Sequence, residues 1–266
     1  MPAGQTRRMA TFDELVAEGA AVPVEGWDFS WFAGRATEER PSWGYARLMA
    51  GRMATATRAL DLQTGGGEVL AGIAQPPPVL VATEGWPPNA VLARHRLAPL
   101  GAEVVQAGEE ADLPFADGFF DLVVSRHPVT VRWPEVARVL APGGTYLSQQ
   151  VGPGSVRELT DFMMGPQPVG RGRDPERARA AATAAGLEVV DLRAEALRME
   201  FNDVAAVIVF LRKVIWIVPG FTVDRYRERL RDLHKQIEAG GPFVAHSQRY
   251  LIEARRPAPG QAATSM

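Results

Sequence analysis

The sequence predicts an α/β protein, with a parallel sheet that is covered by helices on both faces. Between residues 58 and 151, short apolar segments alternate with helical patterns, as they do in parallel sheets. Residues 120–125 are apolar without alternation, which indicates a strand buried on both faces. Another apolar segment ends at Asp61 and is followed by glycines at 65–67, a turn whose backbone can lie against a ligand.

Strands and helices are predicted in regular order through this region. Prolines and glycines set the boundaries, because Pro76–Pro78 ends one helix, Gly101 ends the next and Pro134 begins a third. Strands are expected at 59–62, 79–83, 103–106, 120–125 and 145–151. Helices are expected between them, at 68–74, 89–100 and 134–140.

The C-terminal part of the chain continues with elements of both kinds. A helix is expected at 174–185, strands at 187–192 and 197–201, helices at 203–218 and 222–240, and a last strand at 249–254. The segment of about 201–247 is therefore interpreted as an insertion before the last strand. Residues 257–266 are rich in Pro, Ala and Gly, which predicts a flexible tail.

Composition limits the function classes. The 266 residues carry a net charge of −2, so there is no general basic surface for nucleic acid. The absence of cysteine excludes disulfides, thiolate nucleophiles and cysteine-ligated zinc, and no metal site is predicted. The first 20 residues do not resemble a signal peptide, and the apolar run at 204–211 is too short to cross a bilayer. We expect a soluble, cytoplasmic protein with no membrane partner; no oligomeric state is predicted.

Three motifs occur in order along the predicted sheet. They are Asp61-Leu-Gln-Thr-Gly-Gly-Gly67, then Asp112-Leu-Pro-Phe115 with Asp117 and Phe119–Val124, and finally Arg138-Val-Leu-Ala-Pro-Gly-Gly144. The dinucleotide fingerprint G-x-G-x-x-G fits the first motif poorly, because its third glycine would fall on Leu70. A glycine cluster alone is also consistent with an ordinary tight turn. The interpretation therefore depends on the three motifs together.

Together these motifs resemble the class I S-adenosylmethionine-dependent methyltransferases, of the type 11 kind, over roughly Arg58–Val151. The resemblance implies a Rossmann-like methyltransferase fold whose mostly parallel sheet has seven strands. It implies a cofactor-binding domain at 58–256, an N-terminal helical lid at 1–57 and an insertion that shapes the acceptor pocket. The first glycine of the family's loop is replaced by Gln63, whose side chain is expected to reach the methionine part of the cofactor or to cover the loop.

The resemblance also implies which residues hold S-adenosylmethionine. Glu84 would accept the ribose hydroxyls, Asp112 and the Leu113 amide would bind adenine, and Trp86 would cover the adenine ring. The alternatives are a solvated strand-end acid for Glu84 and a turn residue for Asp112. Asp61 would orient the loop and the cofactor amino group, and Ser125 would contribute its carbonyl near the sulfonium. The predicted cofactor-binding residues are Asp61, Gln63, Gly65, Gly67, Glu84, Trp86, Asp112, Leu113 and Ser125.

A general base is useful when the acceptor must lose a proton. His127, just after the fourth strand of the motif region, is the predicted base, and the alternative is a histidine that packs within its loop. Arg126 would bind an anionic substrate or cap a neighbouring carbonyl. Trp27 and Trp31 belong to an aromatic N-terminal segment that would either line the substrate pocket or pack as a helical cap.

These expectations combine into an enzyme hypothesis. The chain is predicted to be an S-adenosylmethionine-dependent methyltransferase (class EC 2.1.1) that acts on oxygen or nitrogen of a small molecule. One alternative is an RNA or protein methyltransferase. The near-neutral net charge argues against RNA as the substrate. The other is a non-catalytic protein that binds the cofactor on the same fold.

Overall fold

The computed structural model describes residues 10–24, 29–258 and 260. The chain divides into two compact units. The first, which we call the helical unit, contains the described residues of Met1–Glu39 together with Val156–Pro168 and Arg198–Ser247. The second, the sheet unit, contains Arg40–Ser155, Val169–Leu197 and the described residues of Gln248–Met266. Each unit is described below by itself.

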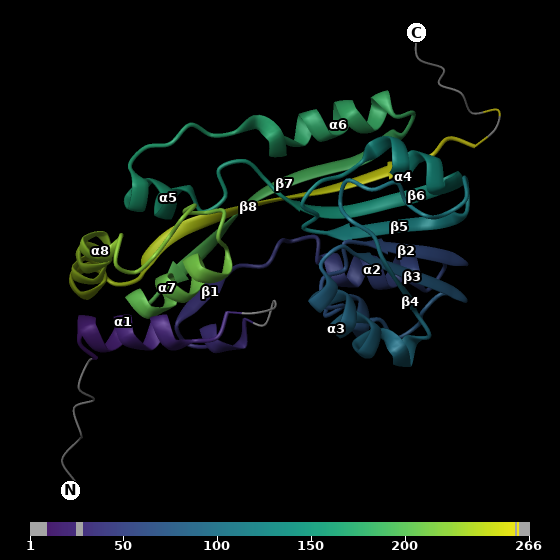
Figure 1. The fold of residues 1–266 in the computed structure, drawn as a ribbon. Coiled ribbons are helices and arrows are strands. Elements are labelled where there is room, and N and C mark those ends of the chain that lie inside the picture. Colours follow the sequence, from purple (N-terminus) through teal and green to yellow (C-terminus); the bar gives the residue numbers. More distant parts are fainter. Residues whose placement is uncertain (1–9, 25–28, 259, 261–266) are drawn as a thin grey trace, which may run out of the picture. The chain divides into compact units, whose positions relative to one another are not determined.

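A mostly parallel sheet confirms the predicted α/β fold (Figure 1). Its strands are β1 (Ala36–Glu38), β2 (Arg58–Leu62), β3 (Val79–Glu84), β4 (Glu103–Gln106), β5 (Phe120–Arg126), β6 (Leu140–Val151), β7 (Glu188–Phe201) and β8 (Phe243–Arg255), in the order β1-β7-β8-β6-β5-β2-β3-β4. The sheet has eight strands, so the prediction of seven was wrong by one. The additional strand is β1, which pairs antiparallel with the end of β7 inside the helical unit.

Helices cover both faces of the sheet unit because buried residues alternate along its strands. Leu80 and Ala82 face a cluster with α2 (Tyr45–Met53) and α3 (Pro87–Leu97). Val81, between them, faces the opposite cluster with α4 (Trp133–Val139) and α6 (Pro175–Ala184). In Figure 1, α4 and α6 accordingly lie above the strands, and α2 and α3 below.

Several predicted elements differ in extent from the observed ones. The helix predicted at 68–74 is only a 3₁₀ turn, Leu70–Gly72, because the glycine loop and the prolines at 76–78 leave too few residues for a helix. The helix predicted to 100 ends at Leu97 and continues as a 3₁₀ turn, Ala98–Leu100. The strands predicted at 187–192 and 197–201 are the single strand β7. Cross-strand pairing holds this strand together although Arg193-Ala-Glu195 interrupts its apolar pattern.

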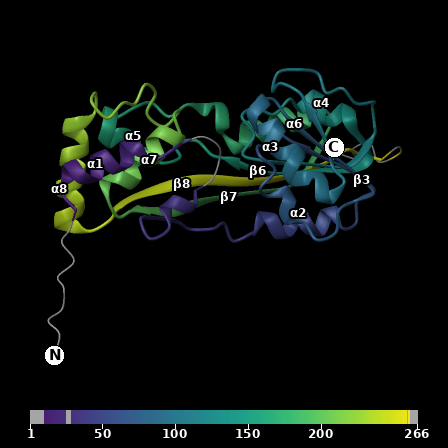
Figure 2. The ribbon, with the colours of Figure 1, turned by 60° about the horizontal axis from the view of Figure 1, so that its bottom comes forward.

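The helical unit packs around one nearly apolar helix. In α7 (Val204–Lys213), all side chains from Val204 to Leu211 are buried, and Asp203 caps its first turn by accepting a hydrogen bond from the Ala206 amide at 2.8 Å. Helices α1 (Phe12–Ala21), α5 (Arg157–Met164) and α8 (Arg227–Gly240) complete the unit (Figure 2). The predicted helices at 203–218 and 222–240 are thus shorter than expected. No described helix is long and apolar enough to cross a membrane.

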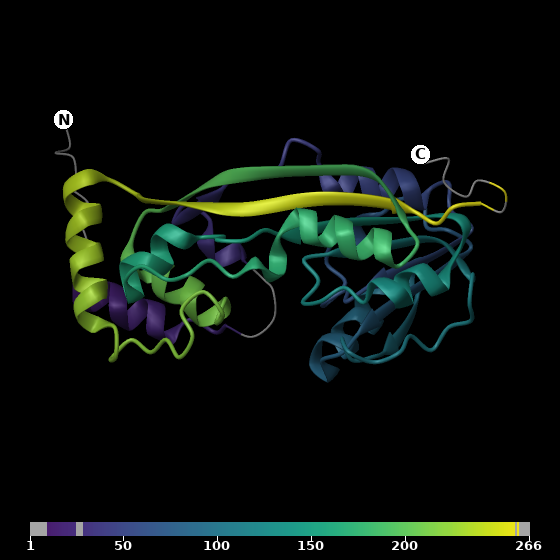
Figure 3. The same ribbon diagram turned by 90° about the horizontal axis from the view of Figure 1, so that it is seen from above.

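The last two strands are the longest of the sheet. Figure 3 shows β7 and β8 running side by side, and β8 begins six residues earlier than the strand predicted from 249. The boundary between the two units passes through both strands, after Leu197 in β7 and after Ser247 in β8. The predicted insertion at 201–247 therefore supplies nearly all of the longest segment of the helical unit.

Candidate functional site

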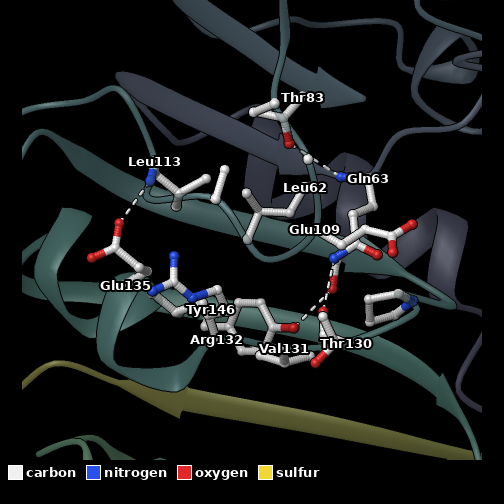
Figure 4. Close-up of a pocket in the computed structure, with 16 residues that line it drawn as sticks. Leu62, Gln63, Thr83, Glu109, Leu113, Thr130, Val131, Arg132, Glu135 and Tyr146 are labelled. Carbon is white, nitrogen blue, oxygen red and sulfur yellow. Dashed lines mark hydrogen bonds between the residues drawn. The ribbon is translucent and has the colours of Figure 1, made fainter. Parts of the chain in front are cut away.

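The predicted site lies where the strand order reverses. From β2 the chain continues to β3 and β4 on one side, and β5 and β6 lie on the other. Ligands of open α/β sheets bind at the carboxyl ends of the strands beside such a switch point. A small cavity of about 30 Å³ occupies this place, which we call the switch-point pocket (Figure 4). Of the predicted residues, Gln63, Leu113 and Ser125 line it.

Gln63 joins the glycine loop to the loop after β5. Its amide nitrogen Nε2 donates to the Thr130 carbonyl at 2.7 Å, and its Oε1 accepts from the Val129 amide at 2.7 Å. Figure 4 shows this side chain extending across the pocket toward Thr130. The backbone of Gln63 has φ +55°, a left-handed conformation that favours glycine. The side chain thus covers the loop, which was one of the two predicted possibilities.

Asp61 and Glu84 are buried carboxylates on the neighbouring strands β2 and β3. Burial raises the pKa of Asp61 to about 7; the neighbouring Thr64 lowers it and the charge of Glu84 raises it further. Burial likewise raises the pKa of Glu84. Among the described residues, neither carboxylate forms an ion pair. The site therefore carries acidic groups whose charge the protein itself does not neutralise.

Glu84 holds the glycine loop in place. One carboxylate oxygen accepts a hydrogen bond from the Gly65 amide at 2.8 Å, and the other accepts from the Trp86 amide at 2.9 Å. Gly65 and Gly67 both have positive φ, and a Cβ atom at Gly67 would lie 2.9 Å from the Leu97 side chain. Trp86 is half exposed at the start of α3. The loop thus packs closely on α3, as a glycine turn permits.

The predicted adenine partners lie in a tightly bonded loop. The Leu113 amide donates to Glu135 Oε2 at 2.7 Å, as Figure 4 shows. Asp112 is exposed and pairs with Arg132 at 2.8 Å. Arg138, the first residue of the third motif, donates to the Leu113 carbonyl at 2.8 Å and pairs with Glu135 at 2.8 Å. The structure therefore gives Leu113 and Asp112 protein partners, and their adenine contacts stay predictions.

Ser125 belongs to a buried hydroxyl network under the pocket. Its carbonyl accepts a hydrogen bond from the Tyr45 hydroxyl at 2.8 Å. Its Oγ lies 2.8 Å from the hydroxyls of both Tyr146 and Ser148. Burial raises the pKa of Tyr146 to about 12, so this hydroxyl remains protonated at neutral pH. The network contributes neutral donors and acceptors beside the pocket.

His127 is held as a neutral imidazole. Its Nε2 lies 2.9 Å from Nε2 of Gln149, whose Oε1 accepts a hydrogen bond from the Trp43 indole at 2.8 Å. Because the indole only donates, the amide group of Gln149 presents its N–H to His127, and the imidazole Nε2 accepts. Burial, followed by the charges of Arg126 and two other arginines, lowers the pKa of His127 well below its usual value.

The remaining predicted residues have less defined places. Arg126 is exposed at the end of β5, beside His127. Trp31 packs in the helical unit, against Phe32 and under the Arg35 guanidinium at 4.6 Å. Trp27 lies outside the described residues. The substrate roles of these three residues stay predictions.

Sequence reasoning missed the residues that hold the predicted ones in place. Gln149, Tyr45 and Glu135 make the contacts described above but lie far along the chain from His127, Ser125 and Leu113. Only Glu135 carried a usable signal, because it precedes Arg138 by one helical turn next to the third motif.

Comparison with known proteins places the site in context. Residues 60–148 match the methyltransferase domain family. A candidate methyltransferase of Bacillus halodurans C-125 has a similar fold, with a TM-score of 0.58 and 20% sequence identity over 82% of this chain and 100% of that chain. The YcgJ protein of Bacillus subtilis gives a TM-score of 0.57 and 19% identity over 80% of this chain and 98% of that chain. A Deinococcus radiodurans R1 protein of unknown function gives a TM-score of 0.55 and 18% identity over 83% of this chain and 90% of that chain. No curated protein matches the sequence at a significant level.

Proposed function

We propose, on the premise that residues 60–148 match the methyltransferase domain family, that the chain transfers a methyl group from S-adenosylmethionine to oxygen or nitrogen of a small-molecule acceptor. The pair of buried carboxylates, Asp61 and Glu84, carries the proposal. Both groups have raised pKa values, and neither has a cationic partner among the described side chains. S-adenosylmethionine bears an ammonium and a sulfonium group, and a nearby cation favours the ionised form of a carboxylate.

The residues present fit the cofactor in chemistry, while the space between them is small. Glu84 and the glycine loop lie at the strand ends where this family holds the ribose and the methionine part. The cavity of about 30 Å³ has room for one or two water molecules. Binding would therefore require the Gln63 side chain to release Val129 and Thr130. This closed arrangement also favours the second candidate, a protein on the methyltransferase fold that does not transfer methyl groups.

In the proposed reaction, bound S-adenosylmethionine supplies a methyl group on a positively charged sulfur. The chain's own contribution is mainly alignment, since a preorganised acceptor needs little further help. His127 is our candidate for removing a proton from the acceptor, and it is already neutral. To act as a base, its Nε2 would exchange the hydrogen bond from Gln149 for one from the acceptor. The net charge of −2 supports a small acceptor over RNA.

Calorimetric titration with S-adenosylhomocysteine tests the cofactor assignment. We expect saturable binding that Glu84→Gln weakens at least tenfold, because the substitution removes a charged acceptor and loosens the Gly65 turn. Glu110→Gln is the matched control, since it removes one carboxylate from an exposed position nearby. Absence of binding by the wild-type chain would refute the proposal. Release of S-adenosylhomocysteine from S-adenosylmethionine, measured with a panel of small hydroxyl and amine acceptors, separates the enzyme from a non-catalytic binding protein.

A further inference from the structure

A second and larger cavity lies beside the switch-point pocket. It has a volume of about 280 Å³, close to the lower limit of small-molecule sites. Pro128, Thr130 and Val131 line both cavities, so they form a shared wall. The other walls come from the end of β6, from β8 and from the segment 172–181, which includes the first turns of α6. We call this cavity the arginine pocket.

Two arginines give the arginine pocket its charge. Arg173 precedes α6 and Arg177 lies in its first turn, and both side chains line the cavity. Neither forms an ion pair with any described residue, and the lining contains no carboxylate. Their neighbours behave differently, since Arg179 is paired with Glu176 at 3.0 Å. An unpaired pair of guanidinium groups on the wall of a cavity is suited to a carboxylate or phosphate.

The lining of the arginine pocket also contains one buried amide side chain. Gln150 is about nine-tenths buried, and its Oε1 accepts a hydrogen bond from the Tyr250 hydroxyl at 2.5 Å. Its Nε2 is buried away from solvent, and hydrogen bonding with Gln150 is one of the contacts that lower the pKa of the Tyr146 hydroxyl. Gln150 is therefore a buried polar residue of the lining, and the two arginines supply the charge that a ligand would meet.

The remaining lining is suited to an apolar body. The apolar lining includes Trp133 and Val131 together with Ala178 and Ala181 of α6. Because the alanine side chains are small, they leave space in the cavity for a ligand. Because Trp133 is almost fully buried yet lines the space, its ring offers a flat apolar surface to an incoming group.

We propose that the arginine pocket binds a small organic anion, with its carboxylate or phosphate on Arg173 and Arg177 and its apolar body between Trp133 and α6. This site is separate from the proposed cofactor site, and its occupation does not require methyl transfer.

The test is an NMR titration of the full chain without S-adenosylmethionine. Phenyl phosphate and benzoate are added separately, and the indole N–H signal of Trp133, assigned with Trp133→Phe, is followed. We expect a saturable shift with at least one of the two anions, and the two titrations show whether phosphate or carboxylate is preferred. Benzyl alcohol, which has a similar ring without the charge, should bind at least tenfold more weakly.

Two variants and one control decide the assignment. Arg173→Gln with Arg177→Gln should weaken binding at least tenfold, whereas Arg179→Gln, a matched loss of charge from the same helix, should leave it unchanged. Ala181→Leu narrows the cavity and should abolish binding while both arginines remain. Circular dichroism verifies that each variant is folded. No saturable shift with either anion, or equal weakening by Arg179→Gln, would overturn the proposal.

Discussion

Asp61 is a buried carboxyl without a cationic partner among the described residues, and its pKa reflects this. Its carboxyl is fully enclosed beside Glu84, and its pKa is raised to about 7. A carboxyl with such a pKa is partly protonated at neutral pH, which costs the protein stability that an exposed aspartate would not. This cost is tolerated where a functional group must stand ready for a ligand.

The stability of the chain should therefore depend on Asp61 and pH. The folded state retains a proton that the unfolded state, with a pKa of 3.8, releases, so the free energy of unfolding falls as pH rises from about 4 to about 7. The full loss is about 4 kcal/mol. The Asp61→Asn side chain cannot ionise, so the variant should not lose this stability. In urea unfolding, the free energy of unfolding of Asp61→Asn relative to wild type should therefore increase from pH 4 to pH 8. Parallel pH curves for Asp61→Asn and wild type would contradict this expectation.

Gln63 combines an unfavourable backbone with two favourable hydrogen bonds. A left-handed conformation costs a non-glycine residue roughly 1–2 kcal/mol, and each hydrogen bond contributes about 1 kcal/mol. We expect Gln63→Gly to change the unfolding free energy by less than about 1 kcal/mol, because it removes the backbone strain and the two hydrogen bonds together, and these contributions have opposite signs. Gln63→Ala keeps the strain and should be less stable than the glycine variant.

The same variants test whether Gln63 holds the switch-point pocket closed. The Val129 amide donates to Gln63, so its hydrogen exchange should become faster in both variants. S-adenosylhomocysteine should bind more tightly to Gln63→Gly than to wild type, because the loop no longer has to be released. Unchanged exchange at Val129 would show that the side chain does not hold this wall.

At the scale of elements, α4 and the loop at 112–117 are joined by one arginine. Arg138 donates to the carbonyls of Leu113 and Phe115, and pairs with Asp117 and Glu135, all within 2.8 Å. This arrangement holds the pKa of Glu135 at about 2. The third motif therefore has a structural role, because its first residue, Arg138, binds the loop at 112–117 that the second motif forms.

Arg138→Met should lower the unfolding free energy by about 3 kcal/mol, because it leaves Glu135 and two carbonyls without their cation. Arg132→Gln is the control, and its exposed pair with Asp112 should contribute less than about 1 kcal/mol. The Glu135 contribution is present above pH 4.5 and is lost as pH falls toward 2, so the wild-type advantage over Arg138→Met should shrink in acid. Chemical denaturation of wild type and both variants at pH 3 and pH 7 measures these differences in unfolding free energy. A difference that stays constant with pH would contradict the role of Glu135.

At the scale of the whole molecule, the two units have separate hydrophobic cores. Every buried residue of the cluster around α7 belongs to the helical unit. The clusters on the two faces of the sheet belong entirely to the sheet unit. Separate cores predict separable local stabilities.

Gly19 offers a way to test this separation. It lies where α1 meets α7, and a Cβ atom there would come within 3.0 Å of the Ala205 carbonyl oxygen and the Ile208 side chain. Gly19→Leu should therefore destabilise the helical unit by roughly 1–3 kcal/mol. Hydrogen exchange should become faster in α7, while β2, β3 and β5 keep their protection and S-adenosylhomocysteine binds as before. Loss of protection in both units together would show that they unfold as one.

The sequence by itself determined the parallel sheet, the positions of its first strands and the glycine loop, because these depend on local pattern and on residues close together in the chain. It also placed Asp61 and Glu84 at neighbouring strand ends. The three motifs predicted a methyltransferase domain, and the match of residues 60–148 to the methyltransferase domain family confirms this prediction for that segment.

Only the tertiary structure decided which partners these residues have. Gln63 extends to Thr130, His127 meets Gln149 on the next strand, and the amide of Leu113 is taken by Glu135. The single long strand β7 also emerged only from pairing with its neighbours. Such contacts join residues far apart in the chain, and the packing of loops, helices and strands in the folded protein sets them. The local sequence pattern does not specify that packing, so the roles of individual site residues depended on the fold.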